Sequence, residues 1–137
     1  MNAMNPLFAS VLVMGGGAVG ALARYQLGRG MAAMLGPQTM TAFPHATLWA
    51  NVLGSFAMGL LAGWLARGGS APGGETMRLL LGVGLLGGFT TFSAFSLEMM
   101  LLIERGQVWL AVTYAGISLF AGLAALYAGL IAMRVAA

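Results

Sequence analysis

The sequence carries very little charge. Only 7% of its 137 residues are charged, six arginines and three glutamates, and lysine and aspartate are absent. Soluble domains usually have about a quarter of charged residues, so this chain cannot cover a water-facing surface. Cysteine is absent too, which excludes a disulfide framework and thiolate metal sites. The arginines form no basic run, so the sequence predicts no nucleic-acid partner.

Catalytic groups are equally scarce. No nucleophile lies beside a base, no pair of carboxylates falls within one apolar segment, and no metal-ligand cluster is present. The single histidine, His45, follows Pro44 in an expected loop and has no partner at ligand spacing. The sequence therefore predicts a protein that is not an enzyme.

Long apolar segments are what the sequence has instead, since 60% of its residues are hydrophobic. A helix needs about 20 apolar residues to cross a bilayer, and four segments meet this requirement. The expected spans are Leu7–Gly28, Thr47–Ala66, Arg78–Ile103 and Val108–Ala132. The first lacks the basic leader and the cleavage site of a signal peptide, so it is expected to be a retained helix. The prediction is an all-α membrane protein with a single four-helix transmembrane domain over residues 1–137.

Glycine is abundant within these spans. The pairs Gly16–Gly20, Gly59–Gly63 and Gly84–Gly88 each have the four-residue spacing that lets helix backbones approach closely in lipid. The glycines therefore predict tight helix packing.

The arginines are evenly divided between the two ends of the expected bundle. Arg67, Arg78 and Arg134 lie on the side of the termini, and Arg24, Arg29 and Arg105 lie on the other side. Three against three leaves the positive-inside rule no bias to act on. Two interpretations stay open. Either the chain inserts in both orientations and two copies pair antiparallel, or one arginine dominates and fixes a single orientation.

Polar side chains within the spans are concentrated in one half of the membrane. Nearly all lie between mid-depth and the end that carries Arg29 and Arg105, whereas the other half has little beyond Ser10 and Tyr127. Such groups are costly in lipid and usually face a protein interior or a water-filled cavity. One copy would thus supply half of a polar pathway, and an inverted second copy the other half.

Three stretches of the sequence resemble the signature segments of the Fluc (CrcB) fluoride channels. They are GGAVGALARY at 16–25, NVLGSFAMG at 51–59 and GGFTTFSAF at 87–95. The resemblance extends over the whole chain, in order, with the same four-span layout. Ala94 stands where the family often has threonine, which is a departure on a helix face.

This resemblance implies a multi-pass protein of the bacterial inner membrane. It implies a dual-topology homodimer with two pores that conducts F⁻ passively out of the cell. It also implies a central structural Na⁺ at the dimer interface. Hydrofluoric acid that enters from an acidic exterior dissociates in the neutral cytoplasm, and the channel would release the trapped anion.

Phe92 and Phe95 are the first candidate pore residues. They lie three positions apart on one helical face, and ring edges carry the positive end of the aromatic quadrupole, so they can face an anion without charge. By spacing alone, Phe89, Phe92 and Phe95 are more typical of ordinary packing residues. The resemblance assigns the pore role to Phe92 and Phe95.

Polar residues of neighbouring spans are further candidates for replacing fluoride's hydration shell. Asn51 offers an amide N–H, and Tyr114 and Ser118 form a hydroxyl stripe at spacing four, although a serine hydroxyl often bonds its own helix. Thr91 and Glu98 share a face with Phe95.

Two charged residues keep two interpretations each. Glu98 is either a pore-mouth group that binds fluoride in its protonated form or an interfacial carboxylate. Arg24 either attracts anions at a vestibule or extends its charge to the membrane surface and anchors its helix.

The middle of the third span is its weakest point as a helix. Gly87 and the pair Thr90–Thr91 lie at the bilayer centre, and glycine costs about 1 kcal/mol relative to alanine within a helix. A break is expected there, the alternative being a continuous helix with glycines used for packing. A break frees carbonyls, and those of Gly87 and Thr90 from two antiparallel copies would form an oxygen cage suited to a hard cation, which the resemblance names Na⁺.

Two rival functions are open to test. A small dual-topology, proton-coupled multidrug exporter would need an acid deep in the first span, and that span has none. An accessory subunit without transport of its own would give no reason for a one-sided polar half.

Overall fold

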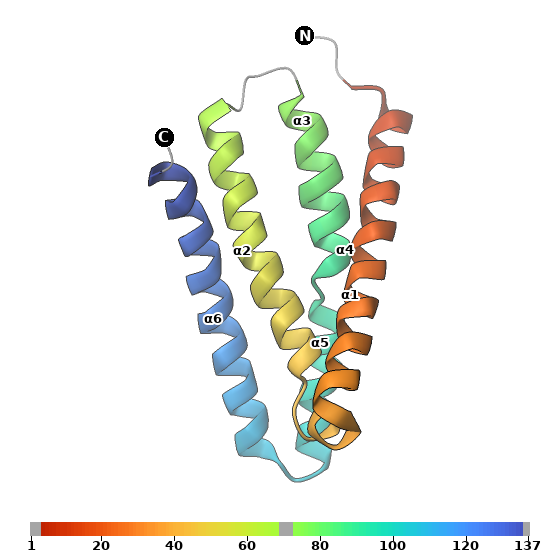
Figure 1. Ribbon diagram of the computed structural model, residues 1–137, viewed down its shortest axis with the longest axis vertical. Coiled ribbons are helices and arrows are strands. Elements are labelled where there is room, and N and C mark those ends of the chain that lie inside the picture. The colour runs from red at the N-terminus through yellow and green to blue at the C-terminus, as the bar shows by residue number, and fades with distance from the viewer. Residues whose placement is uncertain (1–3, 69–72, 136–137) are drawn as a thin grey trace.

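The computed structural model describes residues 4–68 and 73–135 and shows four long helical units side by side (Figure 1). Its elements are α1 (Pro6–Ala42), α2 (His45–Gly68), α3 (Gly74–Met77), the π-helix η1 (Arg78–Leu86), α4 (Gly87–Phe89), α5 (Phe92–Glu104) and α6 (Val108–Val135). Four helical units, Pro6–Ala42, His45–Gly68, Gly74–Glu104 and Val108–Val135, are long and apolar enough to cross a membrane. The all-α, four-span prediction is confirmed.

The first helix is much longer than the sequence predicted. It begins where Asn5 accepts a hydrogen bond from the Leu7 N–H at 2.9 Å, with Pro6 in the first turn. It continues past Gly28 to Ala42, with a kink at Gly36, whose φ of 81° suits a glycine that precedes a proline. The predicted end was wrong because the segment 31–35, MAAML, has high helix propensity although charge interrupts the apolar run before it.

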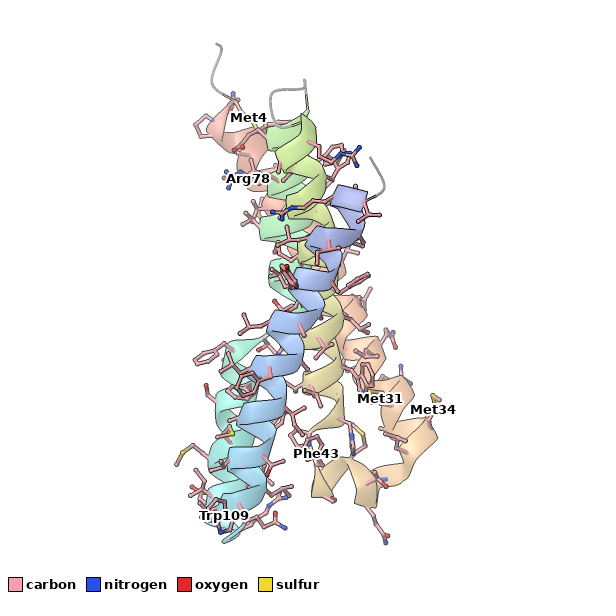
Figure 2. All side chains as sticks on the ribbon, turned by 90° about the vertical axis from the view of Figure 1, so that its left-hand side faces the viewer. Met4, Met31, Met34, Phe43, Arg78 and Trp109 are labelled. Carbon is pink, nitrogen blue, oxygen red and sulfur yellow. The ribbon has the colours of Figure 1, made fainter. Side chains whose placement is uncertain are left out.

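The connection between α1 and α2 is accordingly short. The first residue of α2 is His45, so the prediction that this histidine lies in a loop was wrong. α1 and α2 meet at the lower end of Figure 1, where α5 also turns into α6. At this lower end α1, which carries Met31 and Met34, diverges from α5 and α6, and Phe43 lies between them (Figure 2).

Glycines place the backbones of neighbouring helices in contact, as predicted. A methyl group on Gly16 would overlap the carbonyl oxygen of Leu80, and one on Gly84 would lie 2.9 Å from the carbonyl oxygen of Val13. On the other side of the bundle, a methyl group on Gly59 would overlap the carbonyl oxygen of Leu126. The helix pairs α1–η1 and α2–α6 are therefore joined by backbone contact, the mode that small residues allow in lipid.

The third helical unit is broken in its middle, between α4 and α5 (Figure 1). Thr90 (φ −84°, ψ 159°) and Thr91 (φ −153°, ψ 127°) are both extended. The predicted break is confirmed. Beyond it α5 packs mainly on α6, and a small core around Leu102, Ala111 and Tyr114 closes the lower end.

Candidate functional site

Asn51 of α2 holds the break open by pairing with both backbone groups of Thr91. Its side-chain nitrogen donates to the Thr91 carbonyl at 3.0 Å, and its Oδ1 accepts the Thr91 N–H at 2.8 Å. In a continuous helix this N–H would bond the Gly87 carbonyl four residues earlier. Asn51 therefore accepts the N–H that would otherwise donate to the Gly87 carbonyl.

The Thr91 hydroxyl caps the start of α5 and in this way removes the helical donor of a second carbonyl, that of Thr90. Its Oγ1 accepts the Ala94 N–H at 3.2 Å, which in a continuous helix would bond the Thr90 carbonyl. The Thr90 hydroxyl turns back and donates to the Leu86 carbonyl at 2.8 Å. The carbonyls of Gly87 and Thr90, which the sequence singled out for a cation, are thus the ones whose helical donors are engaged elsewhere.

Arg24 reaches the same break from α1. Its Nε donates to the Gly88 carbonyl at 3.3 Å, so the third carbonyl of this segment has a cationic partner. Arg24 also lines a cavity of about 560 Å³ with Tyr25 and Arg29, whose guanidinium carbon lies 5.9 Å from the Tyr25 ring centroid. Two arginines beside one cavity fit the vestibule interpretation, which stays a prediction.

Glu98 of α5 points into the bundle and binds two hydroxyl groups. The Thr47 hydroxyl donates to Oε1 at 2.6 Å, and the Tyr114 hydroxyl donates to Oε2 at 2.8 Å. Both carboxylate oxygens therefore accept a hydrogen bond from a neighbouring helix. Its place in a pore stays a prediction.

Thr47 was missed by the sequence reasoning. Its signal is its position four residues before Asn51, which places both side chains on one face of α2. The two residues bond α5 and the break, respectively, so one face of α2 carries both polar contacts.

Aromatic rings form a continuous line from the break to the connection between α1 and α2. Ring centroids are 5.8 Å apart for Phe92 and Phe95, 5.0 Å for Phe95 and Tyr114, and 5.4 Å for Tyr114 and Phe43. Phe43, whose ring forms an edge-to-face pair with that of Tyr114, was not among the predicted residues. Tyr114 is fully buried, whereas Phe92 is 79% exposed in the single chain.

Ser118 lies one turn beyond Tyr114 on α6, as the hydroxyl stripe predicts. Its Oγ is buried and has no hydrogen-bond partner within the described part of the chain. By contrast, the hydroxyls of Ser96 and Thr113 bond the Phe92 and Trp109 carbonyls of their own helices. Ser118 therefore has an unused hydroxyl where a buried one is costly.

A cavity of about 300 Å³ opens at mid-height beside the break, lined in part by Asn51, Ser55, Thr90 and Phe92. The predicted residues thus gather in two connected groups. Asn51, Thr91 and Arg24 surround the break, and Phe95, Glu98 and Tyr114 lie toward the lower end. The chain is a small helical membrane protein whose apolar bundle carries a polar and aromatic path in one half.

Comparison with known proteins gives the family. The model of the family described as "CrcB-like protein, Camphor Resistance (CrcB)" matches residues 11–130, so the chain belongs to the CrcB family. The chain is 53% identical over 126 residues to a protein of Novosphingobium aromaticivorans, covering 92% of this chain and 96% of the relative. It is 54% identical over 131 residues to one of Sphingopyxis alaskensis, covering 96% and 97%. Both relatives are named fluoride-specific ion channel FluC.

Proposed function

We propose that this chain forms a passive, fluoride-selective channel of the bacterial cytoplasmic membrane, which exports F⁻ and so confers resistance to it. The observation that carries the proposal is the line of rings and hydroxyls from Phe92 through Phe95 and Tyr114 to Glu98. The names of the relatives supply the ion.

The path suits a small, strongly hydrated anion. Phenyl edges offer positive electrostatic potential without charge, and hydroxyl and amide groups replace water as donors. Asn51 has two amide N–H groups, of which one is bonded to Thr91, and the Ser118 hydroxyl is unpartnered in the described structure. These groups would dehydrate the ion, while close-packed rings exclude chloride.

The functional unit is proposed to be an antiparallel homodimer. Polar and aromatic groups at mid-height are open to the side in a single chain, where lipid would be a poor partner for Asn51, Ser55 and Thr91. The ring of Phe92 is exposed at the same place. An inverted second copy would cover this face and supply the polar half that one copy lacks.

The break fits a structural Na⁺ shared by the two copies. The carbonyls of Gly87 and Thr90 have lost their helical donors, and hard cations prefer oxygen ligands. The described residues contain no cluster of three or more His, Cys, Asp or Glu side chains that could hold a metal ion, so backbone oxygens are the candidate ligands. Bound Na⁺ would supply the positive charge that satisfies these carbonyls at the membrane centre and would not itself be transported.

The rival function, proton-coupled drug export, has less support. The span of α1 carries no acidic residue, and Glu98 is bonded on both oxygens. Passive conduction needs no group that takes up and releases a proton in each cycle.

Fluoride efflux from liposomes tests the proposal. Purified protein is reconstituted in vesicles loaded with fluoride, and release is followed with an ion-selective electrode after the membrane potential is cancelled. We expect rapid F⁻ release, no Cl⁻ release from matched vesicles, and no uptake of a quaternary ammonium dye driven by a proton gradient. Dye uptake without F⁻ release would establish the exporter instead, and neither activity would favour an accessory subunit.

A further inference from the structure

A cavity lies between the end of α1, the start of α2 and the last two turns of α5. It has a volume of about 230 Å³, and its lining includes Thr41, Ala46, Glu98, Leu101 and Arg105. Glu98 and Arg105 are seven residues apart, so they lie on one face of α5 about 10 Å apart along the helix axis. The cavity therefore extends from the partly buried Glu98 carboxylate to the exposed Arg105.

Arg105 lies at the outer end of this cavity and joins two helix ends there. Its Nη1 donates to the Thr41 carbonyl at 2.9 Å, which ties the end of α5 to the end of α1. The Thr41 hydroxyl in turn bonds the carbonyls of Pro37 and Gln38, each at 3.0 Å. A guanidinium has five N–H donors, so this single bond leaves others for a ligand.

The charge of Arg105 is not neutralised by a neighbouring side chain. The ion pair in the described residues joins Arg78 to Glu75, near the opposite end of the third helical unit, and no carboxylate in this part of the chain lies within ion-pair distance of Arg105. Glu98 at the inner end of the cavity carries the opposite charge. An anion in this cavity would be repelled by Glu98 unless a cation compensated it.

We propose that this cavity is an anion-binding mouth that connects Glu98 with water, and that Arg105 attracts small monovalent anions into it. The inference rests on the proposed function only for the identity of the transported ion, which is fluoride. The contact between Arg105 and Thr41 keeps the charge at the rim. A unit charge about 10 Å away in a water-rich mouth changes the local anion concentration by roughly two- to fourfold.

The chain offers a matched control for the structural part of this role. Arg67 also donates from Nη1 to a helix-end carbonyl, that of Met133, at 2.8 Å, and it is exposed like Arg105. It lies at the opposite end of the bundle and lines none of the cavities described above. Arg67→Gln therefore removes the same kind of bond without altering the proposed mouth.

Thiol labelling measures the charge of the cavity without requiring transport. Because the chain has no cysteine, Leu101→Cys creates a single reactive group in the cavity wall. Its reaction rates are measured with an anionic sulfonatoethyl and a cationic trimethylammonioethyl methanethiosulfonate, in detergent micelles and in phosphatidylcholine vesicles. Arg105→Gln should lower the ratio of anionic to cationic rates about four- to sixteenfold, since it affects the two reagents in opposite directions. Arg105→Lys and Arg67→Gln should leave the ratio nearly unchanged, and added inert salt should reduce the difference.

Fluoride efflux supplies the second readout. At low fluoride, Arg105→Gln should slow efflux about two- to fourfold, and the defect should shrink as fluoride saturates the channel. An equal loss of efflux rate with Arg105→Lys or Arg67→Gln would show that Arg105 acts only through its hydrogen bond to the helix end.

Three results would overturn the inference while leaving the proposed function intact. They are a thiol that does not react in the Leu101→Cys variant, a rate ratio that does not respond to Arg105→Gln, and an anion preference in micelles that disappears in phospholipid vesicles. The last would mean that a lipid phosphate, not a free anion, occupies Arg105. Failure of the parent chain to release F⁻ would refute the proposed function instead, and the labelling ratio would still decide the charge of the mouth.

Discussion

Replacing Asn51 with leucine should destabilise the protein and close the break. Leucine keeps the branched shape, but it leaves the N–H and the carbonyl of Thr91 without the partners that now lie at 2.8 and 3.0 Å. A buried polar group left unpaired costs about 1–3 kcal/mol. If the N–H returns to the Gly87 carbonyl as in a regular helix, one of the two losses is recovered, so we expect a net loss of about 1–3 kcal/mol.

Two measurements follow this change. The free energy of unfolding is obtained by titrating dodecyl maltoside micelles with SDS while tryptophan fluorescence is recorded, since the chain has three tryptophans. Hydrogen exchange of peptides covering 86–96 reports whether the break has closed, because a continuous helix would give carbonyl partners to the Phe92 and Ser93 amides, which lie in the first turn of α5. A closed break should also weaken any dependence of stability on Na⁺.

Ser55→Ala is the matched control. Ser55 lies one turn further along α2 and lines the same cavity, but its hydroxyl bonds no other residue in the part of the chain that the structure describes. We expect a change within about 0.5 kcal/mol. Equal stability and equal exchange in the Asn51 and Ser55 variants would show that the pairing with Thr91 does not maintain the break.

Three further predictions concern the pore, the carboxylate and the assembly. Phe92→Ile and Phe95→Ile should reduce fluoride efflux strongly while the protein stays folded, because the ring edge is lost and the volume is roughly kept. Phe89→Ile should have less effect. Equal efflux in all three variants would show that these rings are packing residues. Thr47→Val should remove the 2.6 Å bond to Glu98 and slow efflux without preventing folding, and efflux and chromatographic elution together check this. Copies tagged for cysteine accessibility should appear in both orientations in about equal amounts, and two or three added lysines in one connection should bias them; a single orientation of the unmodified chain would contradict the antiparallel dimer.

The span layout and the break could be predicted from sequence because both depend on local physics. Apolar length sets the spans, and the run of Gly87, Gly88, Thr90 and Thr91 weakens a helix wherever it occurs. The end of α1 could not be placed in this way, because the apolar signal stops near Arg24 and Arg29 while helix propensity continues to the kink at Gly36.

The contacts that define the candidate site could not be predicted from the sequence. Thr47 and Glu98 are 51 residues apart, and Asn51 and Thr91 are 40 apart. A single sequence gives the residue types in each span but not the rotation of one helix against another, so it does not determine these pairs. Phe43 was missed for the same reason, since its contact with Tyr114 depends on how the connection between α1 and α2 folds over α6.

The arginines bear on two separate processes, the insertion of the chain into the membrane and the stability of the folded subunit. During insertion, before the bundle forms, the even division of six arginines between the two ends gives the positive-inside rule no preference. After folding, Arg24, Arg67 and Arg105 each bind a carbonyl of another segment, at Gly88, Met133 and Thr41, where the ends of helices carry partial negative charge. These bonds lie within one chain, so they form identically in either orientation, and a chain inserted both ways folds to the same subunit. A lysine added to a connection would therefore shift the orientation without removing any of these contacts, which is why orientation and subunit stability can be altered separately.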